Sequence, residues 1–163
     1  MAQNFFAATG LVFNNSGEIL MIKHKKLGVW MPPGGHVEKD ELPCEAVVRE
    51  VFEETGVRVK VITAAKDAAP PVDHRCRELP LPMEILSTDF EGDGTHNIIN
   101  FNYLCIAESL ELTLEEKAVD DIGWFTIAEA LELDTFEFVR KSLQKAAEYN
   151  LYFSGGACHG KQA

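Results

Sequence analysis

Apolar runs and short polar breaks alternate in the first quarter of the chain. Residues 5–13 and 18–24 are rich in apolar side chains, and the segment 14–17, Asn-Asn-Ser-Gly, separates them. Two extended segments joined by a short loop of this composition are typical of a β-hairpin. A Gly-rich turn at 32–35 follows. We therefore expect an N-terminal hairpin that leads into a tight turn.

The apolar pattern changes to a helical period over residues 42–55. The apolar positions at helical intervals are Cys44, Val47, Val48 and Val51. Pro43 is tolerated in the first turn of a helix because its missing N–H has no helical partner there. Gly56 suits the residue after the last turn. One amphipathic helix is therefore predicted here.

The rest of the chain is predicted to add four strands and two helical segments. The strands are expected at 57–64, 83–90, 97–107 and 124–126, and the helices at 127–131 and 135–149. The strands at 83–90 and 97–107 flank the turn residues 92–94, which favours a second hairpin. Segment 66–82 contains four prolines. It is predicted to be a long loop, with a short strand near Val72.

Composition limits the classes of protein that the chain can be. Its 163 residues suit one folded domain, expected over 1–153, with a small and polar tail at 154–163 that frays. The net charge of −11 argues against broad binding to a nucleic acid backbone. We find no transmembrane stretch and no secretion signal, so we expect a cytoplasmic protein that does not bind membranes.

The cysteines give little support for a metal centre or a disulfide framework. The four are Cys44, Cys76, Cys105 and Cys158. None stands in a CxxC or similar spacing, which structural zinc sites need. Unpaired thiols in a reducing compartment are the expected state.

The helix at 42–55 carries an acidic sector. With about 100° of rotation per residue, Glu50, Glu53 and Glu54 project from one side of the helix, and we expect that side to lie opposite the stripe of valines. The three carboxylates should then converge. Like charges four residues apart repel each other, and a bound divalent cation would relieve this repulsion. Oxygen-rich clusters of this kind suit Mg²⁺ or Mn²⁺.

A solvated acidic helix face is the alternative interpretation of these glutamates. It does not account for Gly34 and Gly35 just upstream. Glycine lacks a Cβ, so a turn with two glycines can bring the backbone close to the carboxylates. Arg49 stands four residues before Glu53, a spacing that favours an ion pair on the helix surface. A metal site is therefore the preferred hypothesis.

The segment 34–57, GGHVEKDELPCEAVVREVFEETGV, resembles the signature of the Nudix hydrolase family at every position that the signature specifies. These positions are Gly35, Glu41, Arg49, Glu50, Val51, Glu53, Glu54, Gly56 and Val57. Agreement over nine fixed positions is far more specific than a lone glycine motif. The resemblance implies an α/β fold, a single-domain α/β/α sandwich with a mixed central sheet.

The resemblance also implies roles for individual residues. The metal ligands would be Glu50, Glu53, Glu54 and the carbonyl of Gly35, with Mg²⁺ or Mn²⁺ as cofactor. Arg49 would orient the glutamates, while Gly34 and Glu41 would support the site. Glu50, Glu53 and Arg49 are thus the expected catalytic residues, and Glu53 is our first choice for the base that accepts the proton of the attacking water.

A base in a later loop is the alternative, because enzymes of this family differ in where it lies. An acidic run before Trp124 is a candidate source, although a solvated charge run would have the same composition. Its members are Glu115, Glu116, Asp120 and Asp121.

The implied reaction is attack of water on phosphorus. It would cleave a phosphoanhydride bond in a nucleoside diphosphate linked to another moiety, such as a nucleotide sugar or ADP-ribose. The same signature would serve a nucleoside triphosphate pyrophosphohydrolase that sanitises the nucleotide pool. A non-catalytic Nudix-fold module that binds a ligand is the third hypothesis, ranked last because all the carboxylates are present.

Residues that bind the substrate are harder to predict than those that bind the metal. Trp30, His96 and Asn100 are candidates, since an aromatic ring can stack on a base and strand ends can face a cleft. Aromatic residues on strands are more often part of the core than of a binding site, and a histidine such as His96 is more often structural than ligand-binding. Pro70 and Pro71 lie in the general region where ADP-ribose hydrolases of the family carry a proline, but a pair of prolines in a loop usually forms only a stiff turn. We expect a small nucleotide as the partner and leave open a homodimer.

Overall fold

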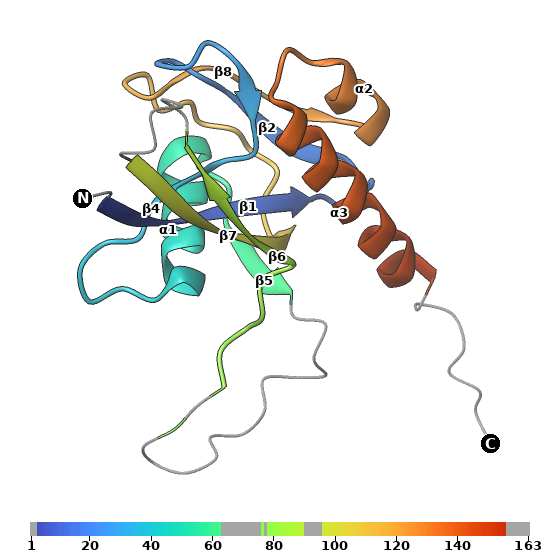
Figure 1. The fold of residues 1–163 in the computed structure, drawn as a ribbon. Helices are drawn as coiled ribbons and strands as arrows, with labels where there is room; N and C mark the ends of the chain where they lie inside the picture. Colours follow the sequence, from blue (N-terminus) through green and yellow to red (C-terminus); the bar gives the residue numbers. More distant parts are fainter. Residues whose placement is uncertain (1–2, 63–75, 77, 90–95, 156–163) are drawn as a thin grey trace, which may run out of the picture.

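The computed structural model of the chain describes residues 3–62, 76, 78–89 and 96–155 (Figure 1). Eight strands and three helices are present in these residues. Along the chain they are β1 (Gln3–Phe13), β2 (Ile19–His24), β3 (Trp30–Met31), β4 (Gly34–His36), α1 (Pro43–Thr55), β5 (Val59–Ile62), β6 (Glu84–Thr88), β7 (His96–Ala107), β8 (Val119–Phe125), α2 (Ile127–Glu132) and α3 (Glu137–Gly155).

The strands form one mixed sheet with the central order β3-β2-β1-β7-β5. β1 and β7 pair in parallel, and every other pairing between described strands is antiparallel. The two predicted hairpins, β1 with β2 and β6 with β7, are confirmed. The predicted turn at 32–35 is only partly correct, because β4 begins at Gly34 and pairs with β1 through Ala8 and Gly35. Backbone hydrogen bonds to β1 therefore hold these glycines in place.

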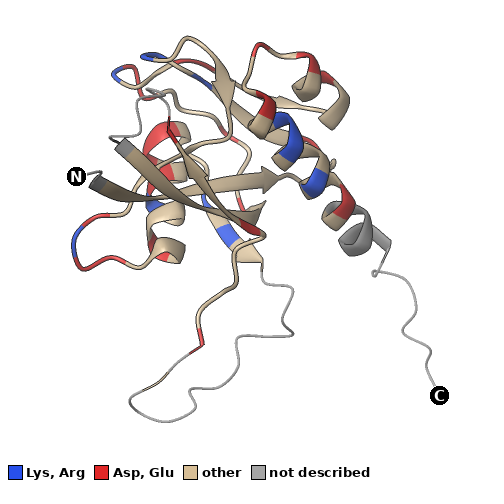
Figure 2. Ribbon diagram, in the orientation of Figure 1, with Lys and Arg blue, Asp and Glu red and all other residues tan. Residues whose placement is uncertain are grey.

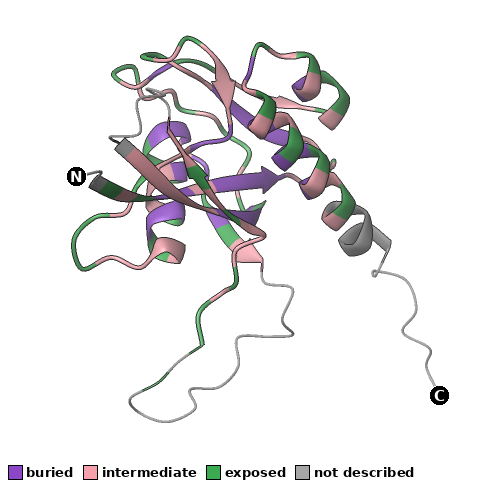
Figure 3. Cartoon of the chain, viewed as in Figure 1, coloured by how far each residue is buried: buried purple, intermediate pink, exposed green. Residues whose placement is uncertain are grey.

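Alternate side chains of the strands supply two separate cores. On β1, Ala8 and Val12 pack toward α1, whereas Leu11 and Phe13 pack toward α2 and α3. Successive residues of a strand point to opposite faces of the sheet, so this division follows from the pleat. Buried residues lie on both faces (Figure 3). The predicted α/β/α sandwich with a mixed central sheet is confirmed.

Helix α1 begins and ends where the sequence predicts. Pro43 occupies the first turn, and the Glu45 carboxylate accepts a hydrogen bond from the Leu42 N–H at 3.2 Å. At the other end Gly56 has a φ of 72°, and its N–H donates to the carbonyl of Phe52 at 2.8 Å. A left-handed residue after the last turn closes the helix with little strain only when it is glycine.

Other boundaries differ from those that the sequence predicts. The strand expected at 124–126 is longer, since β8 begins at Val119. Asp120 and Asp121 are exposed on this strand, so its first half does not show an apolar pattern. Helix α3 runs to Gly155, so the predicted tail boundary at 154 falls inside the helix. Residues 156–163, most of the loop at 66–82 and the turn at 92–94 lie outside the described residues. No helix in the described part of the chain is both long enough and apolar enough to cross a membrane.

Candidate active site

The acidic sector of α1, made by Glu50, Glu53 and Glu54, lies partly on the buried side of the helix. Glu54 follows Val47 by seven residues, close to two full turns, so both side chains point the same way. Glu54 is 7% exposed, while Val48 is 37% exposed. The prediction that the sector lies opposite a stripe of Val47, Val48 and Val51 was therefore wrong. Packing of β4 against α1 covers Glu54 and leaves Val48 at the surface.

Arg49 is the centre of an ion network at the start of the sector. Its guanidinium donates to both oxygens of Glu41 at 2.8 and 2.9 Å, and to Glu50 and Glu53 at 2.8 and 3.0 Å. A further bond at 3.0 Å reaches the carbonyl of His36. The predicted ion pair between Arg49 and Glu53 is thus present. One arginine holds three carboxylates and connects them to the end of β4.

Glu41 belongs to this network as its N-terminal anchor. Its hydrogen bonds to Arg49 lower its pKa, and it also accepts from the N–H of Glu38 at 3.0 Å. These bonds connect the loop before α1 to the middle of the helix. Acidic residues mark α1 and this loop in Figure 2. Glu41 therefore holds Arg49 in place, and its support of a metal site stays a prediction.

Glu54 stands apart from Arg49. Its carboxylate accepts a hydrogen bond of 2.9 Å from the N–H of Gly34, and burial raises its pKa to about 7 against the lowering effect of this bond. The negative charges of Glu50, Glu115 and Glu53 add to the increase. A buried carboxylate surrounded by other carboxylates lacks a compensating cation.

The two glycines of β4 let its backbone approach this carboxylate group. A Cβ on Gly35 would stand 2.4 Å from the carboxyl carbon of Glu50, and a Cβ on Gly34 would stand 2.4 Å from the carbonyl oxygen of Ala8. No larger residue fits at either position without a shift of its neighbours. The predicted reason for these glycines, close approach to the carboxylates without a side chain, is confirmed for Gly35, whereas at Gly34 the missing side chain leaves room for the backbone of β1.

The donor chemistry at this site fits a hard divalent cation, because carboxylate and carbonyl oxygens are its preferred ligands. The buried and uncompensated Glu54 supports that fit. Among the described residues, however, no three His, Cys, Asp or Glu side chains lie close enough together to hold a metal ion. The carboxylates share one sector but do not converge on one point as predicted, since Arg49 binds Glu50 and Glu53 while Glu54 faces Gly34.

Only one member of the acidic run at 115–121 adjoins the site. The N–H of Glu115 donates to the carbonyl of Glu54 at 3.3 Å, and the Glu115 charge contributes to the raised pKa of Glu54. Asp120 instead pairs with Lys25 at 3.9 Å, and Asp121 accepts from the N–H of Ile122. Glu115 is therefore the one carboxylate of this run that the fold brings to the α1 cluster.

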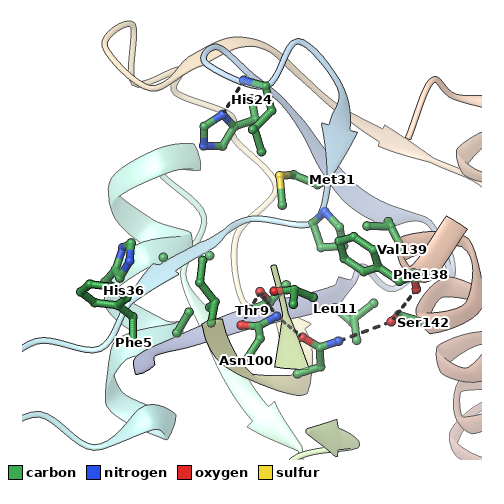
Figure 4. A pocket seen from close by; sticks show the side chains of 18 of the residues that line it. Phe5, Thr9, Leu11, His24, Met31, His36, Asn100, Phe138, Val139 and Ser142 are labelled. Atoms are coloured by element: carbon green, nitrogen blue, oxygen red, sulfur yellow. Dashed lines mark hydrogen bonds between the residues drawn. The ribbon is translucent and has the colours of Figure 1, made fainter. Parts of the chain in front are cut away.

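A cavity of about 470 Å³ lies beside β4 (Figure 4). Gly34 and Gly35 line it, so the cavity and the carboxylates share one strand as their common wall. Aromatic side chains at its edges come from distant elements: Phe5 from β1, His36 from β4 and Phe138 from α3. The sequence did not single out these three rings, because each belongs to a separate apolar or loop segment.

The predicted substrate-binding residues have different outcomes. Asn100 lines the cavity, together with Asn102 two residues later on β7. Trp30 does not line it: its ring packs edge-on against Phe125 at 5.2 Å, at the margin of the second core. His96 begins β7, but its side chain lies outside the described part of the structure. A pair of asparagines at alternate positions of an apolar strand is the signal that could also have identified Asn102.

Three other aromatic residues on β7 and β8 belong to the core on the α1 side. Tyr103 is 3% exposed, and Phe101 and Trp124 pack against the same cluster. The Trp124 indole N–H donates to the carbonyl of Leu110 at 3.4 Å. None of these three lines the cavity, and the interpretation of strand aromatics as core residues holds for them.

Comparison with known proteins gives a family match over most of the chain. The NUDIX domain family model matches residues 4–146. A MutT-like protein of Streptomyces ambofaciens is 46% identical over 55 residues, 34% of this chain and 36% of that protein. The mouse bis(5'-nucleosyl)-tetraphosphatase (asymmetrical) is 23% identical over 120 residues, 74% of this chain and 71% of that protein. The first of these matches spans only about a third of the relative's own length.

The same architecture is found in solved structures. A NUDIX-family hydrolase from Clostridium perfringens superposes with a TM-score of 0.73 at 23% identity, covering 91% of this chain and 99% of that one. At this level of identity the superposition establishes the fold.

Proposed function

The chain belongs to the Nudix family, and on that premise we propose that it is a metal-dependent hydrolase that cleaves a phosphoanhydride bond in a nucleoside diphosphate linked to another moiety. The observation that carries this proposal is the shared wall between the α1 carboxylates and the cavity. A ligand whose nucleoside enters the cavity would place its phosphates along Gly34 and Gly35, beside Glu50 and Glu54.

The residues of α1 would have roles in metal binding, positioning and proton acceptance. Glu50, Glu53, Glu54 and the Gly35 carbonyl would hold Mg²⁺ or Mn²⁺, which when bound would stabilise negative charge on the phosphates and lower the pKa of the attacking water. Arg49 would keep Glu50 and Glu53 in position through its bonds of 2.8 and 3.0 Å. We assign proton acceptance to Glu53, because its side chain is 56% exposed and one of its oxygens is oriented by Arg49.

Charge favours a diphosphate-linked substrate over a triphosphate. Among the residues that line the cavity, Lys26 is the one permanently charged cation, and the whole chain carries a net charge of −11. Each additional phosphate charge would need a cation that the described walls do not supply.

A panel of nucleotides with Mg²⁺ or Mn²⁺ tests this proposal. The full chain would be incubated with ADP-ribose and nucleotide sugars in one arm, and with the common nucleoside triphosphates in the other. Released nucleoside monophosphate and the second product would be quantified by chromatography. We expect kcat/KM at least about tenfold higher in the first arm, a difference of about 1.4 kcal/mol in transition-state binding.

Other outcomes would contradict the proposal in different ways. Preferential release of pyrophosphate from triphosphates would identify a pyrophosphohydrolase of the nucleotide pool. Binding without hydrolysis in either arm would identify a ligand-binding module. Glu54→Gln is the matched control, since it keeps the shape of the side chain and removes its charge.

A further inference from the structure

A chain of hydrogen-bonded polar side chains runs from the cavity to helix α3, on the face of the sheet away from α1. We call it the amide ladder, and its members are Thr9, Asn100, Asn102, Glu84, Ser142 and Lys145. Thr9, Asn100, Asn102 and Ser142 line the cavity (Figure 4). The ladder takes no part in the chemistry assigned to the α1 carboxylates.

Glu84 sets the direction of the ladder. An ionised carboxylate accepts hydrogen bonds and donates none. One Glu84 oxygen accepts from the Ser142 hydroxyl and from Nδ2 of Asn102 at 2.9 Å, and the other faces the Lys145 ammonium at 3.4 Å. The Asn102 amide must therefore turn its NH₂ group toward Glu84. Its carbonyl oxygen is left to face Asn100.

The orientation passes from Asn102 to Asn100. Oδ1 of Asn102 accepts from Nδ2 of Asn100 at 2.7 Å, and the second Nδ2 hydrogen of Asn100 goes to the Thr9 hydroxyl at 2.9 Å. Thr9 in turn donates to Oδ1 of Asn100 at 3.1 Å. Both amide NH₂ groups are thus fully used inside the protein. Asn102 is 4% exposed. If its amide flipped, its carbonyl oxygen would face the Glu84 carboxylate in a buried place, and this would have a high free-energy cost.

The remaining hydrogen-bonding capacity that the ladder holds in a fixed direction is a lone pair, because the Thr9 hydroxyl can rotate and the Asn100 amide cannot. Oδ1 of Asn100 and Oγ1 of Thr9 each keep one acceptor position after these bonds are counted. The imidazoles of His24 and His36, which could donate, lie away from Thr9 and Asn100 in the cavity (Figure 4). The polar end of the cavity therefore presents hydrogen-bond acceptors to a ligand.

We propose that the amide ladder selects nucleotides whose base carries an exocyclic amino group over those that carry a carbonyl at the same place. The proposal rests on the assignment of the cavity to the nucleoside of the substrate. An amino group can donate to Oδ1 of Asn100, whose orientation the ladder fixes, whereas a carbonyl at the same place brings its lone pairs against those of Oδ1. Glu84 does not line the cavity and acts as a positioning residue, because its charge holds both amides in the accepting orientation.

Matched pairs of monophosphates test this selection without any hydrolysis. The dissociation constants of AMP and IMP, and of CMP and UMP, would be measured by calorimetry on the full chain with chelator present. We expect the amino member of at least one pair to bind about tenfold or more tightly, the usual effect of one unmatched polar contact. Equal affinities, tighter binding of the keto members, or no detectable binding of all four would overturn the proposal.

Two variants separate the ladder from a general effect of charge. Glu84→Gln should reduce the amino-to-keto ratio toward one, since a glutamine can donate and so releases both amides to flip. Glu148→Gln removes the same charge from an exposed position on α3 and should keep the parental ratio. If Glu84→Gln does not fold, Asn100→Val tests the ladder instead, and it should also reduce the amino-to-keto ratio toward one. A folded Glu84→Gln protein with the parental ratio would overturn the role of Glu84.

The outcomes distinguish this inference from the proposed function. Tighter binding of AMP or CMP by a chain that hydrolyses no anhydride would support the ladder and contradict the hydrolase. Hydrolysis with equal kcat/KM for adenine and hypoxanthine substrates would support the hydrolase and contradict the ladder.

Discussion

Two polar clusters adjoin β4, and they differ in how their charges are compensated. On the α1 side, Arg49 binds Glu41, Glu50 and Glu53, while the buried Glu54 has a single hydrogen bond from Gly34. Its pKa is raised to about 7 by burial and by its acidic neighbours. On the cavity side, every amide hydrogen of the ladder has a partner, and the charge of Glu84 is balanced by Lys145.

This difference separates sites for chemistry from sites for recognition. A cluster with excess negative charge is strained without a cation and gains stability when one binds. A satisfied network is rigid and presents a fixed pattern of acceptors. The comparison predicts opposite responses of the two clusters to loss of a polar group. Removal of the Glu54 charge should stabilise the metal-free protein, whereas removal of an amide of the ladder should destabilise it.

The largest expected effect is the loss of activity in Glu54→Gln. The substitution keeps size and helix propensity and preserves an acceptor for the Gly34 N–H. Without the charge, the metal should bind weakly or in the wrong place, which should lower kcat/KM about a hundredfold or more. Turnover of the best substrate of the panel, at several Mg²⁺ or Mn²⁺ concentrations, checks this. Parental turnover in a folded variant would remove Glu54 from the metal site.

The same variant should be more stable than the parent in the absence of metal. The folded-state pKa of Glu54 is raised from 4.5 to about 7. Its contribution to the free energy of unfolding is therefore fully favourable below pH 4.5 and is lost as the pH rises through 7. Glu54→Gln should therefore gain up to about 3 kcal/mol over the parent at pH 8, and little at pH 4.5. Urea unfolding with chelator at both pH values measures this gain. A gain that does not depend on pH would contradict the raised pKa.

Asn102→Ala should have the smallest of these effects, and it should lower the stability of the protein rather than raise it. The side chain is 4% exposed and bonds to Asn100, Glu84 and Ser142. Its removal leaves these partners incompletely satisfied and should cost about 2 kcal/mol at all pH values. Ser87→Ala, at an exposed position of β6, is the control and should change stability by less than about 0.5 kcal/mol. An unchanged melting temperature for Asn102→Ala would show that the ladder contributes nothing to stability.

Local sequence determined helix α1 and its acidic composition. The proline of the first turn, the glycine at the end and the spacing of the carboxylates are all contiguous, so period and end signals suffice to predict them. The Arg49–Glu53 pair follows from helical spacing in the same way. The two hairpins were also predictable, because short polar loops separate their strands.

Tertiary structure alone decided which side of α1 is buried. From the sequence, Val48 and Glu54 look like a core residue and a surface residue, but β4 packs against the helix and reverses them. The cavity cannot be predicted from any one segment, since its lining residues come from β1, β2, β3, β4, β6, β7 and α3, among others. The orientation of Asn100 depends on Glu84, which lies 16 residues earlier on β6 and acts through Asn102. Such a chain of bonds exists only after the strands pair, because hydrogen-bond direction is a property of neighbours in space.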